Sequence, residues 1–171
     1  MDEIKLEIKM IKDTAVLPKY ANYADAGLDI YAAEDVRIPP ETSKKVSTGL
    51  ILNIPIGYEV QIRPRSGLSL KTRLRLPNSP GTIDATYKDE LEVIVYNASP
   101  ISSSYKEDGS LRELDLNEKD NRAGAYTIKT GDRICQMLLK KVYQVDTVKV
   151  DEFTYNADLD RGGGFGSSGL H

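Results

Sequence analysis

The chain contains very few of the residues on which hydrolytic and zinc chemistry usually depends. Among its 171 residues, the only histidine is His171, the only cysteine is Cys135, and tryptophan is absent. These absences exclude a Ser-His-Asp or Cys-His relay, the ligand set of a zinc deaminase and a disulfide within the chain. Any chemistry must therefore use carboxylates, hydroxyls and cations, with or without a hard metal ion. Because Cys135 lies in the apolar stretch at residues 134–139, we expect a buried structural thiol.

The sequence also lacks an excess of one charge and any long apolar run. With 23 basic and 26 acidic residues, the net charge is −3, and the basic residues are interspersed with acids. We therefore expect no nucleic-acid partner, because no basic stripe is available for a phosphate backbone. No apolar run is long enough to span a bilayer, and the first residues lack the basic start of a signal peptide, so we expect no membrane association. A single cytoplasmic domain covering residues 1–171 is the expected organisation.

Alternation of apolar and polar residues predicts β-strands along most of the chain. In residues 4–10, for example, apolar and charged residues alternate strictly. No convincing amphipathic helix is found, and glycine, proline and asparagine separate the apolar segments. The expected strands cover residues 4–10, 44–54, 58–62, 91–96, 126–128, 134–142 and 147–150. This pattern predicts an all-β domain of the sandwich, jelly-roll or barrel type.

Residues 98–124 interrupt this pattern with a long polar insertion. Its sparse apolar residues Leu111, Leu114 and Leu116 are sufficient for at most a small hairpin. Loops of this length in a compact domain are usually functional or mobile. We expect a solvated surface loop, with contact to a protein partner as the alternative interpretation.

Residues 161–169 form a glycine-rich segment with one cation, one aromatic ring and two hydroxyls. Glycines leave backbone N–H groups free to surround an anion, while Arg161 can pair with phosphate oxygens and Phe165 can lie on a base. This composition favours a flap that closes over a nucleotide, and a disordered tail is the alternative interpretation. The spacing G-x-G-x-x-G at residues 164–169 does not predict a dinucleotide fold, because it does not connect a strand to a helix.

A first interior cluster, at residues 63–69, lies where a predicted strand ends. Gly67 permits a tight bend there, and Arg65 and Ser66 can both face an anion. An ordinary turn at the end of a strand is equally compatible with the cluster. A Walker A loop is excluded because Leu70, rather than glycine, precedes the Lys-Thr pair.

Two further clusters lie in residues 78–90 and 131–137. In the first, Asp84 is the best candidate for a general base, because a carboxylate fixed in a turn can hold and polarise a water. Tyr87 can offer its ring face to a sugar, and the alternative for the aspartate is a hydrogen bond to its own backbone. In the second, Gln136 stands among apolar neighbours, and a half-buried amide requires a hydrogen-bonding partner.

Together with residues 26–30, these clusters resemble, in the same order, the five motifs of the trimeric dUTP diphosphatase (dUTPase) family. The motifs are similar to Ala-Gly-x-Asp-Leu, Pro-Arg-Ser-Gly, Gly-x-Ile-Asp-x-x-Tyr, Gly-Asp-Arg-Ile-x-Gln and Arg-Gly-x-Gly-Phe-Gly-Ser-x-Gly. The resemblance extends from Ala24 to Gly169. Each motif alone is weak, and the shared order of all five makes the resemblance specific.

The resemblance implies a jelly-roll fold and a homotrimer with three active sites at the subunit interfaces. One subunit would supply the Arg65 segment and Gln136, a second the Asp84 hairpin, and a third a flexible C-terminal arm at residues 156–171. The implied reaction converts dUTP and water to dUMP and pyrophosphate. Asp84 would deprotonate a water that attacks the α-phosphate. Mg²⁺ would be held mainly by phosphate oxygens and waters, with Asp29 as an outer-shell residue that acts through water.

The resemblance also implies the residues that bind the substrate. The expected set is Arg65, Ser66, Gly67, Asn78, Gly81, Ile83, Tyr87, Gln136, Arg161, Phe165, Gly166, Ser167 and Ser168. The hairpin that carries Asp84 would bind uracil through backbone groups and Asn78, which disfavours cytosine because its hydrogen-bonding pattern is inverted. Phe165 would add about 1–3 kcal/mol by stacking on the base.

The chain departs from the family at two places and leaves two other functions open. It has Lys88-Asp89 where the family commonly has Arg-Gly, so we expect a strained or altered hairpin. Some phage members of the family carry extra sequence at the place of residues 98–124, and this sequence can serve partner proteins. If the protein is viral or phage-encoded, the expected location is the host cytoplasm. The alternatives are a dCTP deaminase, alone or as a bifunctional dCTP deaminase/dUTPase, and a nucleotide-gated regulatory binding protein that uses the insertion.

Overall fold

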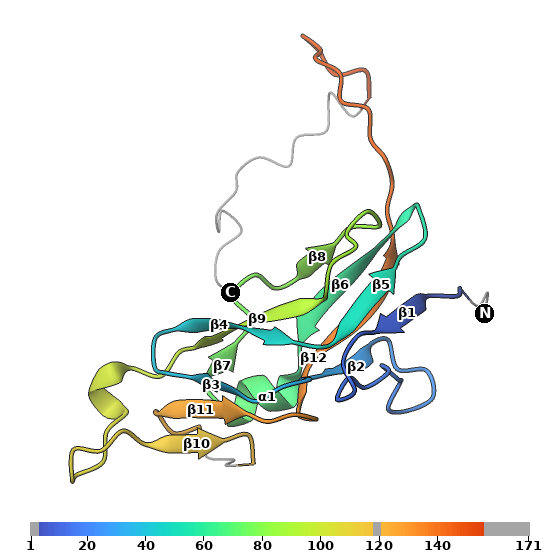
Figure 1. Cartoon of the computed structure of the whole chain (residues 1–171). Coiled ribbons are helices and arrows are strands. Elements are labelled where there is room, and N and C mark those ends of the chain that lie inside the picture. The colour runs from blue at the N-terminus through green and yellow to red at the C-terminus, as the bar shows by residue number, and fades with distance from the viewer. Residues whose placement is uncertain (1–3, 118–120, 156–171) are drawn as a thin grey trace.

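The computed structural model describes residues 4–117 and 121–155 and is almost entirely β-structure (Figure 1). Within these residues the chain forms twelve strands, one short α-helix and one 3₁₀ turn. The elements are β1 Glu7–Met10, β2 Leu28–Tyr31, β3 Val36–Ile38, β4 Ser43–Ser47, β5 Leu50–Asn53, β6 Tyr58–Pro64, α1 Ser66–Lys71, β7 Leu74–Arg75, β8 Gly81–Ile83, β9 Glu92–Asn97, η1 Ile101–Ser103, β10 Glu113–Asp115, β11 Ala125–Ile128 and β12 Arg133–Lys141. The predicted all-β class is confirmed.

The strands pair into four small sheets around one apolar core. The sheet orders are β1-β5, β10-β11-β3, β2-β12-β6-β8 and β4-β9-β7. In the four-stranded sheet, β12 is antiparallel to both β2 and β6, which brings three distant parts of the sequence side by side. Among the described strands, only β10 and β11 pair in parallel. In β9, residues alternate between exposed and buried positions, which is the two-residue period expected of a strand with one face on the core.

The single strand predicted for residues 44–54 is wrong, because the chain turns at Thr48 and Gly49 and forms β4 and β5 instead. Gly49 has a φ of +67°, a conformation that a residue with a side chain adopts only at a cost. A Cβ atom built on Gly49 would lie 2.7 Å from the Cβ of Ala15, so the N-terminal segment packs directly on this turn. The apolar pattern continues through the break and therefore does not reveal it.

Replacing Gly49 with alanine is expected to destabilise the fold by roughly 2–4 kcal/mol, because the positive φ and the overlap with Ala15 act together. Urea unfolding measures the change in the free energy of unfolding. Gly57→Ala is the matched control: Gly57 also has a positive φ, +86°, but no atom lies within 4 Å of the position that an added Cβ would occupy. The control should lose only about 1 kcal/mol, from the backbone term alone. Equal losses in the two variants would show that the contact with Ala15 is unimportant.

Two other expectations about secondary structure are also wrong. Residues 66–71 form the helix α1 rather than a bend at Gly67, and Gly67 has no positive φ. The helix is six residues long and buries only Leu68, so it is too short to show a helical period in the sequence. Residues 147–150 alternate like a strand but have no strand partner among the described residues.

The insertion at residues 98–124 is more closely integrated than a solvated loop or small hairpin. Its strand β10 pairs with β11, and Leu114 is buried in the core. The guanidinium of Arg112 donates hydrogen bonds to the carbonyl oxygens of Ser103, Tyr105 and Ala123, which organises the loop around one side chain. The expectation of a solvated loop with at most a small hairpin is therefore wrong for its second half.

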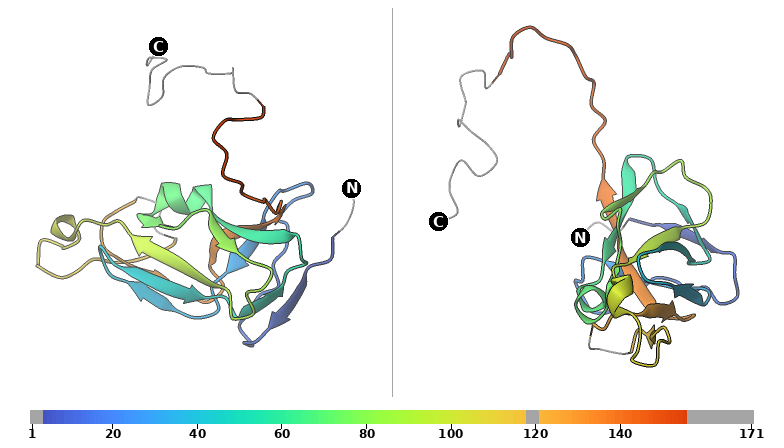
Figure 2. Two further views of the ribbon diagram at one scale, coloured as in Figure 1. Left: turned by 90° about the horizontal axis from the view of Figure 1, so that it is seen from above. Right: turned by 90° about the vertical axis from the view of Figure 1, so that its left-hand side faces the viewer.

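After β12 the chain leaves the body of the molecule as an extended arm (Figures 1 and 2). The N–H of Val142 still donates to the carbonyl of Gly57, but residues 143–155 are exposed. The arm exposes large apolar side chains, among them Tyr143, Val145, Phe153 and Tyr155, each at least 77% exposed. Residues 156–171, where the sequence predicts a flexible arm, lie outside the described residues.

Candidate active site

A buried carboxylate, Asp29 on β2, organises the first group of predicted site residues. Its side chain is only 4% exposed. Oδ1 accepts hydrogen bonds from Arg65 Nε at 3.1 Å and Gln136 Nε2 at 3.3 Å, and Oδ2 accepts one from Arg133 Nη1 at 3.2 Å. Gln136 thus finds the partner that its position required. Three sequence clusters far apart in the chain meet at this one aspartate.

Strand pairing explains why these residues meet. Gln136 on β12 lies directly opposite Asp29 on β2 and opposite Arg63 on β6. Arg65 follows two residues after Arg63, between the end of β6 and the start of α1. The register of β12 against β2 shifts between Arg133 and Cys135, an irregularity of the kind that re-aims side chains at functional sites.

The group leaves hydrogen-bonding capacity for an anionic ligand. Two guanidinium groups share one carboxylate, so the cluster carries a net positive charge. Arg65 and Arg133 are partly exposed, with 25% and 49% of their side chains accessible. A cavity of about 430 Å³ opens beside the cluster, and its lining includes Asp25, Gly27 and the Asp29 cluster itself. Preorganised guanidinium groups at a cavity are suited to bind phosphate oxygens.

Cys135 lies next to Gln136 and faces the other side of the sheet. It is fully buried and forms no disulfide. Burial raises the pKa of its thiol far above the ordinary value, and neighbouring Arg65 lowers it only in part. The prediction of a buried structural thiol is confirmed.

The second group of predicted residues lies on and around β8. Val60 and Ile62 of β6 pair with Ile83 and Gly81, so Asp84 follows directly from a paired strand. The N–H of Tyr87 donates to the carbonyl of Asp84 at 3.1 Å, which closes a turn. Asn78 is exposed and approaches Gly81, since a Cβ built there would lie 3.4 Å from the Asn78 amide nitrogen.

The side chain of Asp84 is exposed, and it accepts no hydrogen bond from the described part of the chain. It therefore does not cap its own turn, which was the alternative interpretation of this residue. A carboxylate held by its backbone and open at its oxygens can bind and polarise a water.

The two groups lie toward opposite ends of β6. Ile83 pairs with Val60 in an antiparallel register, so Asp84 comes beside Glu59, six residues before Arg65. At ~3.3 Å per residue, this separation is roughly 20 Å. One chain therefore does not bring Asp84 to the Arg65 cluster.

The described residues also include Ser66 and Gly67, at the start of α1 next to Arg65. The predicted flap residues Arg161, Phe165, Gly166, Ser167 and Ser168 lie outside the described residues. Arg133, the second cation on Asp29, was missed as a site residue. Its place in the same cluster as Gln136 was the available signal, but its side-chain direction depends on the register shift in β12.

Comparisons with known proteins point to one family. The dUTPase family model matches residues 13–107. A deoxyuridine 5'-triphosphate nucleotidohydrolase of Solibacter usitatus is 39% identical over 169 residues, with 97% of each chain covered. The chain belongs to the dUTPase family. A second relative with the same name, from Nautilia profundicola, is 39% identical and covers 97% of this chain and 99% of its own.

Solved structures of phage dUTPases have the same fold. The dUTPase of the S. aureus phage phi11 superposes with a TM-score of 0.78 at 27% identity, covering 89% of this chain and 99% of the phage chain. A variant of the Staphylococcus bacteriophage 80alpha dUTPase with dUpNHpp has a TM-score of 0.79 at 27% identity and covers 97% and 99%. The structure of a variant of the phi11 dUTPase shows the coordination of a structural Mg(II) ion, and another phi11 structure shows a species-specific insert.

The departure from the family motif at Lys88-Asp89 does not strain the hairpin, contrary to the expectation from the sequence. Asp89 is not among the residues with a positive φ, so it does not need the freedom of the family's glycine. Lys88 Nζ donates to Asn53 Oδ1 at 3.0 Å and ties the hairpin to β5. The expected strain is therefore wrong, because the local backbone follows an ordinary path.

The donor set suits a metal ion that arrives with its substrate. Within residues 4–117 and 121–155, no group of three or more His, Cys, Asp or Glu side chains is arranged to hold a metal ion. Asp29 uses three of about four acceptor positions on its carboxylate, which leaves one for a metal-bound water. Mg²⁺ commonly keeps several waters and binds through substrate phosphates, so these residues fit it as an outer shell.

Among residues 4–117 and 121–155, no helix has the length and apolar character of a membrane span.

Proposed function

We propose that the protein hydrolyses dUTP to dUMP and pyrophosphate. The observation that carries the proposal is the cluster of Arg65, Arg133 and Gln136 on the buried Asp29, in a chain that aligns over 97% of its length with deoxyuridine 5'-triphosphate nucleotidohydrolases. The cluster supplies an anion site, and Asp84 supplies an open carboxylate. These are the two elements that water attack on a phosphate requires.

At the phosphate end, Arg65 and Gln136 bind phosphate oxygens, with Ser66 and the backbone of Gly67 beside them. Asp29 holds both side chains before the ligand arrives, so little conformational entropy is lost on binding. Phosphoryl transfer depends chiefly on positioning and on stabilising negative charge. A chain without an internal histidine can supply both.

At the nucleoside end, Asp84 accepts a proton from the water that attacks the α-phosphate. Asn78, Gly81 and Ile83 contact uracil, and the Tyr87 ring lies against the deoxyribose. Bound with the triphosphate, Mg²⁺ would neutralise charge on the phosphate oxygens, with Asp29 contacting it through water. Arg161, Phe165, Gly166, Ser167 and Ser168 complete the proposed site as a flap.

We also propose that the active unit is a homotrimer. Asp84 and Arg65 lie roughly 20 Å apart in one chain, at ~3.3 Å per strand residue, so we place them in sites that are shared between subunits. The exposed apolar side chains of residues 143–155 support an arm that packs on another subunit, since such exposure is unusual in a monomer. Closed threefold symmetry would build three equivalent sites.

The test is pyrophosphate release by the purified protein with Mg²⁺ and dUTP, beside dCTP, dTTP and UTP, with ammonia followed in parallel. We expect pyrophosphate from dUTP alone. Ammonia from dCTP would identify a deaminase or a bifunctional enzyme, and no reaction with any of the four would contradict the proposed function.

Deletion of residues 161–171 is expected to leave a folded trimer that hydrolyses dUTP at least about tenfold more slowly, because the flap's phosphate and base contacts are lost. Sedimentation measures the trimer and pyrophosphate release measures the activity. A truncated protein as active as the full chain would show that these residues do not belong to the site.

A protein partner at residues 98–124 stays a prediction, as does the cytoplasmic location. Leu114 serves the core, so deleting the whole insertion would damage the fold. Ile101 and Tyr105, about half exposed, are the side chains to replace with serine when binding of a partner is measured. Unchanged binding would exclude this surface.

A further inference from the structure

The loop between β8 and β9, residues 84–91, carries Asp84 and Tyr87 but contains no strand or helix residue. Two hydrogen bonds fold it on itself: the N–H of Tyr87 donates to the carbonyl of Asp84, and the Tyr87 hydroxyl donates to the carbonyl of Glu90 at 2.9 Å. Neither bond fixes the loop relative to the rest of the protein. Its position must come from contacts outside the loop.

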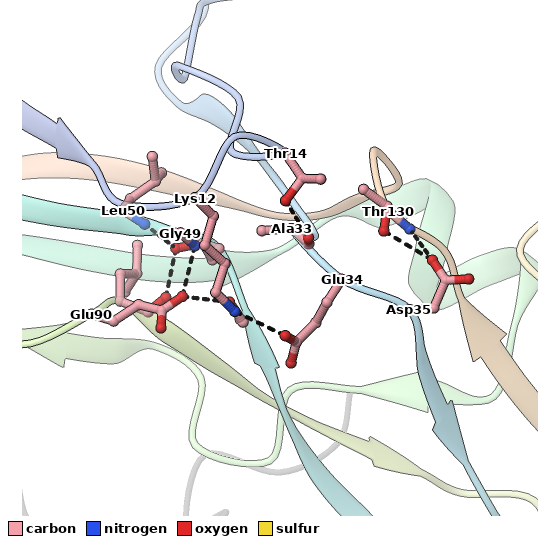
Figure 3. Close-up of polar contacts among 12 residues, drawn as sticks. Lys12, Thr14, Ala33, Glu34, Asp35, Gly49, Leu50, Glu90 and Thr130 are labelled. Carbon is pink, nitrogen blue, oxygen red and sulfur yellow. Dashed lines mark hydrogen bonds and ion pairs between the residues drawn. The ribbon is translucent and has the colours of Figure 1, made fainter.

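Glu90 makes the most extensive of these contacts (Figure 3). Its Oε1 accepts hydrogen bonds from the Ser47 hydroxyl and from the N–H of Gly49, the latter at 2.7 Å. The Ser47 hydroxyl in turn accepts a hydrogen bond from Lys12 Nζ at 2.7 Å, and Lys12 also pairs with Glu34 at 2.8 Å. Partial burial alone would raise the pKa of Glu90, but these hydrogen bonds and the Lys12 charge lower it, so the carboxylate stays ionised at neutral pH.

The turn between β4 and β5, which binds the Glu90 carboxylate, is fixed by further contacts. Gly49 packs on Ala15 with a positive φ, as described above. Next to Glu90, the Thr48 hydroxyl donates to the carbonyl of Leu91 at 2.6 Å, and the N–H of Leu91 donates to the carbonyl of Leu50 at 2.8 Å. The turn between β4 and β5 is therefore a rigid support for the end of the loop.

We propose that Glu90 is a positioning residue, whose contact with Ser47 and Gly49 fixes residues 84–91, and with them Asp84 and Tyr87, relative to β5. The proposal rests on the proposed hydrolysis of dUTP, in which Asp84 acts on the attacking water. Glu90 acts only through the loop. A displacement of about 1 Å at a reacting group can cost on the order of 100-fold in rate, so a support of this kind matters for turnover.

Glu90→Gln tests the proposal, because glutamine keeps the shape but loses the charge that both donors face. We expect kcat to fall about tenfold, whereas KM changes less than about threefold. Glu92→Gln is the matched control: the Glu92 side chain pairs with Lys45 at 2.6 Å and, although its backbone lies opposite Ser47 in the strand pair, it makes no hydrogen bond with the Ser47 or Gly49 donors in the described chain. The control should keep kcat and KM.

Hydrogen exchange separates positioning from general destabilisation. In Glu90→Gln, we expect faster amide exchange confined to residues 84–91, with the trimer and the exchange of β6 and β12 unchanged. Faster exchange throughout the core, or an unchanged kcat, would overturn the proposal.

Ser47→Ala provides an independent variant if Glu90→Gln does not fold. It removes one of the two donors and should lower kcat in the same direction by a smaller factor. Combined with Glu90→Gln, it should add nothing, because both substitutions remove the same contact. Full additivity would contradict the proposal. If the wild type failed to release pyrophosphate from dUTP, the proposed function would fail, while the exchange experiment would still decide whether Glu90 holds the loop.

Discussion

Asp84→Asn is expected to bind dUTP but to lose most of its turnover, with kcat reduced roughly 100- to 1,000-fold. Asparagine has nearly the same shape and can still hydrogen-bond a water, but it cannot accept its proton. General-base catalysis typically raises the rate by about 10²–10⁴-fold, so removal of the base is expected to lower kcat by a factor of that order. The Asp84 carboxylate makes no internal hydrogen bond in the described chain, so the substitution should not disturb the fold.

The measurement pairs steady-state pyrophosphate release with calorimetric binding of a non-hydrolysable imido analogue of dUTP. The analogue's affinity should change by less than about threefold, because a lost base affects the transition state and not the bound ground state. Asp89→Asn is the matched control, since Asp89 is an exposed acid in the same loop. Normal turnover in Asp84→Asn would remove Asp84 from the mechanism, and equal losses in both variants would indicate a general charge effect.

Asp29→Asn should have the second large effect, on the phosphate end of the site. The Asp29 carboxylate accepts from Arg65, Arg133 and Gln136, and an amide in its place presents an NH₂ group to at least one of these donors. Two guanidinium groups lose their shared counter-charge and their fixed orientation. We expect kcat/KM for dUTP to fall about 100-fold, in line with the sensitivity of turnover to misplaced binding groups.

The loss in stability from Asp29→Asn should be smaller than for a fully buried pair. Breaking a buried ion pair typically costs about 3–5 kcal/mol, but Arg65 and Arg133 are partly exposed and solvent screens them, so about 1–3 kcal/mol is expected. Urea unfolding measures this term separately from kinetics. Binding of dUMP should hardly change while binding of the triphosphate analogue weakens, because Asp29 organises only the phosphate side.

A surface pair supplies the control for Asp29→Asn. Arg37 and Glu113 form a bidentate ion pair between β3 and β10, and both side chains are about half exposed. Glu113→Gln should cost less than about 1 kcal/mol and leave turnover unchanged. If Asp29→Asn behaved like this surface control in both assays, Asp29 would have no organising role.

The sequence alone indicated most of the longer strands and predicted candidate residues of the site, but it did not show the break at Gly49, the helix α1 or the place of Arg133. Alternation indicated the strands, because one face of each strand must be buried. A half-buried Gln136 required a partner, and Cys135 among apolar residues had to be a buried thiol. The ordered motifs predicted that Asp29, Arg65, Asp84 and Gln136 belong to one family site, and the structure brings Asp29, Arg65 and Gln136 into contact.

Only the tertiary structure decided how these residues are supported and which of them meet. The pattern of one strand does not identify its partner strand, since pairing joins segments that are far apart in sequence. Arg133 reaches Asp29 because the register of β12 shifts, and Glu90 reaches Gly49 because a turn with a positive φ interrupts an apolar run that continues in the sequence. The separation of Asp84 from Arg65 follows in the same way from the register of β6 with β8 and β12, which is a property of the folded sheet and not of either motif.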